Sequence, residues 1–400
     1  MDMAWFGVLS GSSLNFLSIY AARLGATGIQ IGLLTGIGAA VTLVLAIPTG
    51  GWLERRPIDK AMFWTAVAYR LGFLLFIPLP WLLGSQGQIQ LIILLTAIMA
   101  IPLTALGVGF NVLFAAAVPL RWRAYVVGSR NVALALTFMA ASLGCGYLLD
   151  HLPFPQGYQV VFAIGVLGAA MSTMHIYFIR PLPASAHQDD LQEELPVPDA
   201  VQKEEHGGKA SKRGAALRLD IWRSPFRRVL LAMLGFHLAQ YLAIPLFPLY
   251  FVDVLQLNDQ QIGAGTALFY LAVLLGSAQL HRAARRMGNK SLTAVGVVGM
   301  GSYPLLMGLS SQVWQYYIVS FLGGLGWSLA GGAYTNYMLE RMPPADRHAH
   351  FAWYTIVLNA CILVGSLLGP IIARNVALST ALVVFGILRV LAGMAIWWFG

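Results

Sequence analysis

The 400-residue chain alternates between long apolar stretches and short polar joins. Most apolar stretches run for about twenty residues or more, the length that a helix needs to cross the roughly 30 Å hydrocarbon layer of a bilayer. The pattern therefore predicts an all-α membrane protein with twelve transmembrane helices, six on each side of a long polar segment. The predicted spans cover residues 4–23, 28–49, 61–83, 89–118, 124–149, 158–179, 229–252, 260–280, 291–310, 313–339, 349–373 and 378–399.

The polar segment divides the chain into two bundles of six helices, residues 1–180 and 227–400, joined by a linker over 181–226. Acidic residues, Pro, Gly and Lys fill much of the linker, and apolar periodicity is absent, so we expect it to be largely disordered. Residues 217–228 differ, because LRLDIWRSPFRR mixes apolar with basic side chains. That mixture is typical of a short amphipathic helix on a membrane surface.

Composition supports the membrane interpretation, since only 10% of residues are charged against roughly 25% in soluble domains. The net charge of +9 would suggest a nucleic-acid partner in a soluble protein, but its distribution is informative here. Of the 25 Lys and Arg residues, 20 lie in joins after even-numbered spans and two after odd-numbered ones. This bias predicts that both termini are cytoplasmic. We expect a monomer in a bacterial inner membrane, with lipid around it and no nucleic-acid partner.

Motifs for catalysis or metal binding are absent from the sequence. The two cysteines, Cys145 and Cys361, fall in apolar segments, and neither a Walker A sequence nor an H-E-x-x-H pattern occurs. We therefore expect no enzyme activity, no cofactor and no metal site.

The two halves share short patterns at nearly constant offsets. Gln30-Ile31-Gly32 opens the second span, and Gln261-Ile262-Gly263 opens the eighth, 231 positions later. A second pattern, G-x3-N-x7-P, places Asn111 in the fourth span and Asn336 in the tenth. Together these matches predict a parallel duplication, a design in which substrate binds between the halves near the bilayer midplane.

With its twelve spans, its central linker and the stretch GGWLERRPIDK after the second span, the chain resembles the major facilitator superfamily. That family has a G-x-x-x-D-R-x-G-R-K signature at this place and often an echo after the eighth span. The resemblance implies a conformational latch, a motif whose charged residues form ion pairs in one transport state only. Its residues would be Gly50, Glu54, Arg55, Arg286, Gly288 and Lys290. Glu54 and Pro57 depart from the family pattern.

The resemblance also implies function: a secondary transporter that moves a small organic solute by rocker-switch alternating access. Efflux of an amphipathic or anionic compound is our hypothesis. The alternative is a membrane chaperone or assembly factor on the same fold that transports nothing.

Three charges are embedded in predicted spans, namely Arg70, Arg130 and Arg389. Embedded charges are costly and usually functional, and the sequence shows no carboxylate at a matching depth. In the family fold Arg130 would lie on a cavity-lining span, where it could bind an anionic substrate or extend to the membrane surface. The family keeps the spans of Arg70 and Arg389 at the periphery, so we expect these two to bond backbone carbonyls or lipid phosphate.

Protons are the candidate coupling ion, and three alternatives stay open. His237 could carry the proton, an acidic residue at a span end such as Asp253 could do so, or the protein could be a uniporter.

Uncharged polar residues and two ionisable ones outline a substrate cavity on six spans. They are Asn15, Asn111, Arg130, Asn131, His237, Gln240, Tyr241, Asn336, Tyr354 and Asn359. Hydrogen bonding between helices inside each half is the competing explanation for the polar members. In the seventh span, Pro245 and Pro248 each remove a helix hydrogen bond and predict a break near one end.

Overall fold

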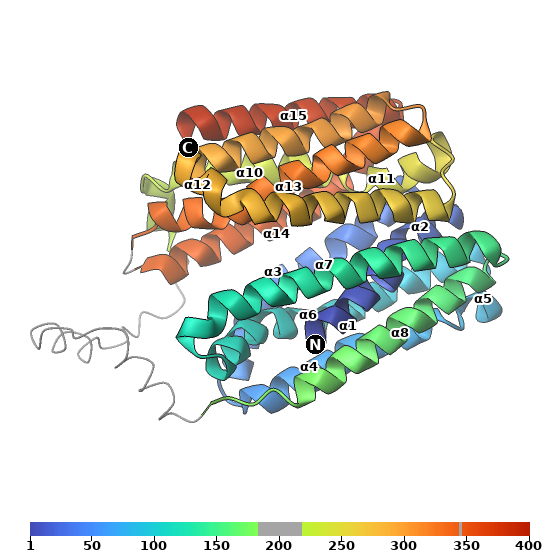
Figure 1. Cartoon of the computed structure of the whole chain (residues 1–400), viewed down its shortest axis with the longest axis horizontal. Helices are drawn as coiled ribbons and strands as arrows, with labels where there is room; N and C mark the ends of the chain where they lie inside the picture. The colour runs from blue at the N-terminus through green and yellow to red at the C-terminus, as the bar shows by residue number, and fades with distance from the viewer. Residues whose placement is uncertain (183–217, 344–345) are drawn as a thin grey trace, which may run out of the picture.

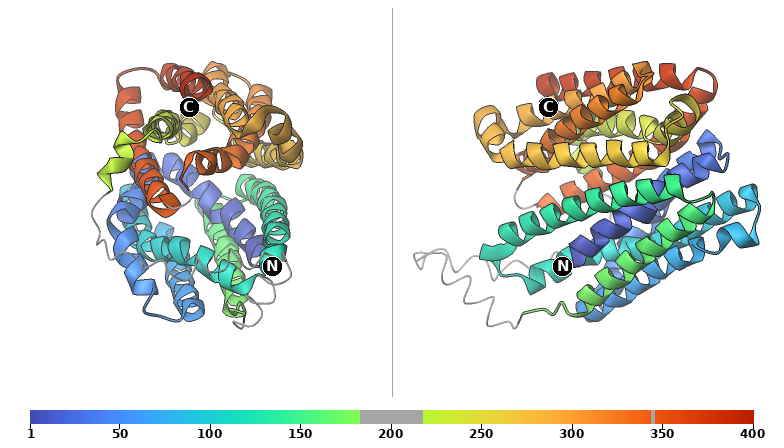
Figure 2. Two further views of the ribbon diagram at one scale, coloured as in Figure 1. Left: turned by 90° about the vertical axis from the view of Figure 1, so that its left-hand side faces the viewer. Right: turned by 45° about the vertical axis from the view of Figure 1, so that its right-hand side comes forward.

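The computed structural model describes residues 1–182, 218–343 and 346–400. Within these ranges the chain is helical throughout apart from turns and short joins, and the helices form two bundles. Figure 1 shows the N-terminal bundle, blue to green, below the C-terminal bundle, yellow to red. We call these the N-half and the C-half. In the view along the helices, the helices of each half are grouped around a separate axis (Figure 2, left).

Six spans make up the N-half, and two of them contain a local change of helix type. The first span has a π-helical turn at Ser10–Leu14, and the third has a 3-10 stretch at Gly72–Phe76. The elements are α1 (Asp2–Leu9), α2 (Asn15–Arg23), α3 (Gly28–Leu53), α4 (Ile58–Leu71), α5 (Leu79–Leu82), α6 (Ser85–Ala117), α7 (Leu120–His151) and α8 (Gln156–Tyr177).

The C-half has the same arrangement, and its first span is interrupted where the prolines predict a break. α10 ends at Ala243, two residues before Pro245, and the short α11 and a π-helical turn at Tyr250–Val254 follow. The elements are α10 (Arg227–Ala243), α11 (Leu246–Leu249), α12 (Asp259–Leu309), α13 (Val313–Arg341), α14 (Arg347–Arg374) and α15 (Leu378–Phe399).

The prediction of twelve spans in two bundles is confirmed. Eight helices in the described residues are long and apolar enough to cross a membrane. One of these, α12, contains the eighth and ninth spans, because its backbone turns at Gly288, where φ is +75°. The first, third and tenth spans complete the set, two of them interrupted as described above.

The predicted linker and the predicted amphipathic helix lie partly outside the described residues. Of the predicted linker, residues 183–217 lie there, and so does the first residue of the predicted amphipathic helix. The remainder forms a 3-10 turn at Leu219–Arg223, and α10 begins at Arg227.

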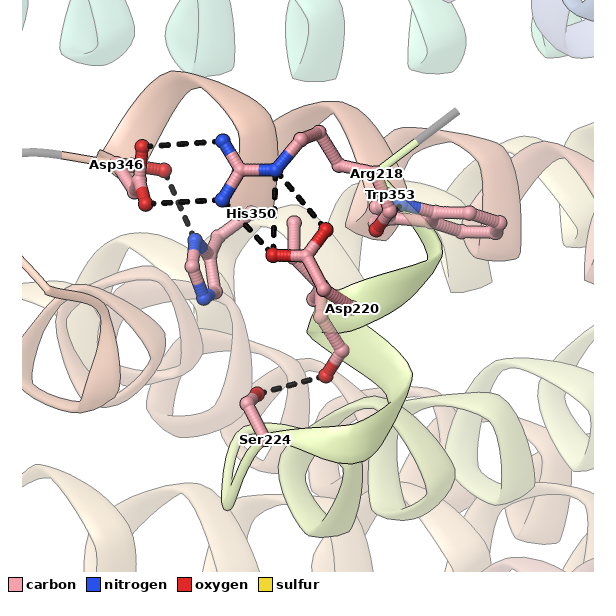
Figure 3. A network of polar contacts seen from close by, with 7 residues as sticks. Arg218, Asp220, Ser224, Asp346, His350 and Trp353 are labelled. Carbon is pink, nitrogen blue, oxygen red and sulfur yellow. Dashed lines mark hydrogen bonds and ion pairs between the residues drawn. The ribbon is translucent and has the colours of Figure 1, made fainter. Parts of the chain in front are cut away.

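A polar network fixes this turn to the start of α14 (Figure 3). The Arg218 guanidinium bonds Asp220 at 2.9 Å and Asp346 at 3.1 Å. The Arg218 carbonyl accepts a hydrogen bond from Trp353 Nε1 at 3.0 Å. The hydrogen bond from Arg218 lowers the pKa of the Asp220 carboxyl. The entry to the seventh span is thereby attached to the eleventh.

The halves meet along two long helix pairs, α3 with α14 and α7 with α12. Gly32 of α3 lies so close to the Ser366 carbonyl of α14 that a β-carbon would overlap it. Gly263 of α12 approaches the Ser142 carbonyl of α7 in the same way. These approaches occur near the end of the molecule opposite the linker, which we call the far end. At the linker end, by contrast, Gly50 of α3 and Gly128 of α7 have no described atom within 4 Å of a β-carbon position.

Candidate substrate site

An ion pair joins the two halves at the far end. Arg23 Nη2 at the end of α2 lies 3.0 Å from Asp259 Oδ1 at the start of α12. Tyr158 Oη of α8 donates to the same carboxylate oxygen at 2.9 Å, and Arg23 also donates to the Leu257 carbonyl at 2.8 Å. Because the donors, Arg23 and Tyr158, come from one half and the acceptors from the other, these three bonds hold the far end closed.

A second carboxylate crosses the same junction. Asp150 of α7 accepts hydrogen bonds from the backbone amides of Asp259, at 3.0 Å, and Gln260, at 3.3 Å. The first amides of a helix lack partners within the helix and carry the positive end of its dipole, so an anion there is stabilising. The described conformation is therefore closed at the far end by contacts between the two halves.

A cavity of about 460 Å³ lies mainly within the C-half and extends to Asn15 of the N-half. We call it the aromatic cavity, because seven aromatic side chains line it. These are Phe247, Phe251, Phe269, Tyr270, Tyr303, Tyr316 and Trp327. Arg389 and Gln240 also line it, and Arg389 is its one charged residue among the described lining. Such a cavity can bury an unsaturated or aromatic ligand and hold one negative charge.

Arg389 of α15 is 3% exposed and donates to three backbone carbonyls. Its Nη2 lies 2.9 Å from the Gln240 carbonyl and 3.4 Å from that of Ala239, and its Nη1 lies 3.2 Å from that of Met300. The prediction of carbonyl bonding is confirmed, and the side chain in addition lines the cavity, which the sequence did not indicate. Its Nε has no hydrogen-bond partner among the described atoms.

Two of the ten predicted site residues line the aromatic cavity. Gln240 has a buried Oε1 without a described hydrogen-bond partner. Asn15 Nδ2 donates to Ser142 Oγ at 3.1 Å, and that hydroxyl donates to the Gly263 carbonyl of the other half at 3.2 Å. Asn15 thus lies where the cavity meets the contact between the halves.

Two other predicted residues, Asn111 and Arg130, line a separate cavity of about 240 Å³ inside the N-half. Arg130 Nη2 lies 3.0 Å from Asp2 Oδ2. The expectation that no carboxylate neutralises the embedded arginines is therefore wrong for Arg130. Asp2 and Arg130 are 128 positions apart, and only the packing of α1 against α7 brings them together.

The other predicted residues do not gather in one place. His237 Nε2 lies 3.0 Å from the Tyr354 hydroxyl, and both side chains are buried in the C-half away from the lining of the two cavities. Asn359 bonds within its own helix, donating to the Thr355 carbonyl at 2.9 Å. Tyr241 is half-buried, whereas Asn131 and Asn336 are exposed.

The predicted latch residues lie at the linker end. Glu54 and Arg55 are exposed, and the Glu54 carboxylate has no hydrogen bond or ion pair among the described residues. Near the echo, Asn289 Nδ2 donates to Glu340 of α13 at 2.6 Å, beside the turn at Gly288. Pairing of the latch in another transport state stays a prediction.

Comparison with known proteins assigns the chain to a family. The model described as Major Facilitator Superfamily matches residues 3–258 and again 229–400. The chain belongs to the major facilitator superfamily. As such it is an integral, multi-pass membrane transporter and not an enzyme.

Relatives within the superfamily are distant. The cis,cis-muconate transport protein of Acinetobacter baylyi is 24% identical over 247 residues. That match covers 61% of this chain and 56% of the relative, so it spans little more than half of the relative's length.

Solved structures of other transporters share the fold over nearly all of the chain. One is the nucleoside transporter NupG, with a TM-score of 0.67, 13% identity, and coverage of 100% of this chain and 98% of that one. Another is the xylose transporter XylE from E. coli in a partially occluded inward open conformation, with a TM-score of 0.72 and 14% identity. It covers 100% of this chain and 96% of the XylE chain. At these identities the likeness shows the fold alone.

Proposed function

We propose that the protein moves a small unsaturated or aromatic carboxylate across the membrane by rocker-switch alternating access, and that the aromatic cavity is its substrate site. The observation that carries the proposal is Arg389, a buried cation on a wall of aromatic rings with no carboxylate at ion-pair distance in the described residues. An unpaired charge in a buried site is costly, and a bound anion offsets that cost.

Two further observations support this choice of substrate. Aromatic side chains favour flat unsaturated groups, which stack on ring faces and edges. The distant relative from Acinetobacter baylyi is a transport protein for cis,cis-muconate, an unsaturated dicarboxylate. Muconate and benzoate are therefore the first compounds to test.

The transport cycle follows from the way the halves meet. With the far end closed by Arg23, Asp150 and Asp259, the substrate reaches the aromatic cavity from the linker end. Rocking the halves about the bound substrate would separate these contacts and bring the latch residues together. If the linker end is cytoplasmic, as the Lys and Arg distribution predicts, this cycle permits the efflux that we hypothesise, with protons as the candidate coupling ion.

The test is transport by purified protein in liposomes. We expect counterflow of labelled muconate or benzoate, and competition by benzoate but not by its neutral analogue benzamide. Arg389→Gln should raise the half-saturating concentration about tenfold or more, since a hydrogen bond to a charged group contributes about 1.5–3 kcal/mol. Arg374→Gln, outside the aromatic cavity, is the matched control.

A second variant guards against misfolding, because Arg389 also bonds three carbonyls. Trp327→Leu keeps that network and should weaken binding of benzoate more than that of a saturated carboxylate. Equal competition by benzamide and benzoate would refute the anionic substrate. Failure to move either muconate or benzoate would refute the proposed substrate class.

A further inference from the structure

The smaller cavity, inside the N-half, contains more positive than negative charge. Five helices line it: α1, α4, α6, α7 and α8. Its charged residues are Arg70, Arg130 and Asp2, two cations and one carboxylate. We call it the arginine cavity.

Three buried polar atoms on side chains that line this cavity have no hydrogen-bond partner in the described residues. They are Nε of Arg70, Nε of Arg130 and Oγ of Ser172. Arg70 is 6% exposed and Ser172 is fully buried. Buried donors without partners are rare and costly, and the convergence of three on one cavity indicates a missing acceptor.

Neighbouring groups accept hydrogen bonds from only some of the N–H groups of the two guanidinium groups. Arg70 Nη1 donates to Thr173 Oγ1 at 2.8 Å, and Arg130 Nη2 pairs with Asp2. The Phe110 ring lies 4.7 Å from Arg130 Cζ, and the Phe6 ring lies 5.9 Å from Arg70 Cζ. Ring faces attract a cation but accept no strong hydrogen bond, so one positive charge is left without an anion.

We propose that the arginine cavity binds a small monocarboxylate, with Asp2 as the permanent counter-ion of Arg130. A guanidinium presents its N–H groups in a planar fork that matches a carboxylate, and Ser172 can supply a further donor. The volume of about 240 Å³ lies below the roughly 300–1,000 Å³ of pockets for drug-sized ligands, which favours a smaller ligand. This site is separate from the aromatic cavity and does not depend on the substrate proposed for it.

The arginine cavity opens along α6. The lining residues Leu103, Gly107 and Asn111 are exposed, whereas those on α4 and α8 are buried. The cavity is therefore open along this side of α6, and the amide of Asn111 lies at the opening.

The experiment measures the melting temperature of the detergent-solubilised full chain in increasing acetate, at constant ionic strength set with chloride. We expect a saturable rise with acetate and none with acetamide, a neutral compound of the same shape, because a ligand stabilises the state that it binds. An equal rise with acetamide, or no rise with acetate, would overturn the proposal.

Variants assign the effect to the cavity. Arg70→Gln should abolish the acetate shift, while Ser172→Ala, a small change that leaves both arginines, should raise the half-saturating concentration about two- to tenfold. Arg389→Gln alters the other cavity and should keep the shift. Loss of the shift in Arg389→Gln together with its persistence in Arg70→Gln would place the anion in the aromatic cavity and refute the arginine cavity as a site.

Discussion

At the scale of single residues, three arginines embedded in the spans have three different kinds of partner. Arg70 bonds a threonine hydroxyl, Arg130 pairs with a carboxylate, and Arg389 bonds backbone carbonyls. Neutral acceptors leave the full positive charge in place, so Arg70 and Arg389 attract anions in a way that Arg130 does not. This difference sets where a negatively charged ligand can bind.

The histidine of the seventh span has a role that the structure makes testable. His237 bonds the Tyr354 hydroxyl inside the C-half and lines neither cavity. We expect His237→Gln and Tyr354→Phe each to lower stability by about 1 kcal/mol, from loss or weakening of this bond. Transport measured between about pH 5 and pH 8 should keep its pH profile in both variants. A profile that flattens in His237→Gln alone would instead assign the coupling proton to this histidine.

The ion network at the entry to the seventh span should respond to acid. Because Arg218 lowers the pKa of Asp220, the carboxylate stabilises the folded segment above its unfolded pKa of about 3.9, and this contribution is lost as the pH falls through the lower folded value. A spin label at Arg223→Cys should show constant mobility from neutral pH down to about pH 4 and greater mobility below it.

The matched variant for this experiment is Arg218→Gln. It removes the hydrogen bonds to Asp220 and Asp346, so the label should be more mobile at every pH. Equal mobility in both proteins at neutral pH would show that the network does not hold the segment.

At the scale of helices, the halves approach through glycines placed where a side chain does not fit. Gly32→Ala puts a β-carbon against the Ser366 carbonyl, and overpacking of this kind costs about 1–3 kcal/mol. Gly38 lies on the same helix, and its β-carbon position has only Ala100 at 4.0 Å, so Gly38→Ala is the control.

We expect Gly32→Ala to lower the melting temperature and Gly38→Ala to leave it unchanged or raise it slightly, since alanine favours helix. Equal effects of the two substitutions would contradict close packing of α3 on α14.

Helices were also where sequence and structure agreed best. Span length and proline position predicted the twelve spans and the break at Pro245, because both depend on local chain properties. The pairing of Asp2 with Arg130 and the position of Arg389 depend on which sides of the helices pack against each other. Long apolar helices carry little periodicity to fix those sides, and the family expectation of a peripheral twelfth span gave no indication that the Arg389 side chain lines the cavity.

At the scale of the whole molecule, two sets of charges at opposite ends should act against each other. Arg23→Gln removes the ion pair that closes the far end, and a hydrogen bond between charged groups contributes about 1.5–3 kcal/mol. We expect the equilibrium to shift roughly tenfold or more toward the far-end-open state. Glu54→Gln removes a proposed latch contact of that other state and should shift the balance in the opposite direction.

Accessibility of single cysteines introduced in the aromatic cavity, probed with a membrane-impermeant reagent from each side, measures both shifts. Labelling that changes in the same direction in the two variants would contradict the opposed-ends model. Unchanged labelling in Glu54→Gln would show that the latch does not contribute to the balance between the two states.

The capping of α12 by Asp150 makes the end of that helix a reporter of the transport cycle. Asn258 caps Gln261 from within its own half, at 2.8 Å, so that amide keeps its acceptor when the halves separate. The amides of Asp259 and Gln260 depend on the opposite half and lose theirs. Hydrogen exchange at these two positions, referenced to Gln261 next to them, would then count how often the far end opens, with no label and no substitution in the protein.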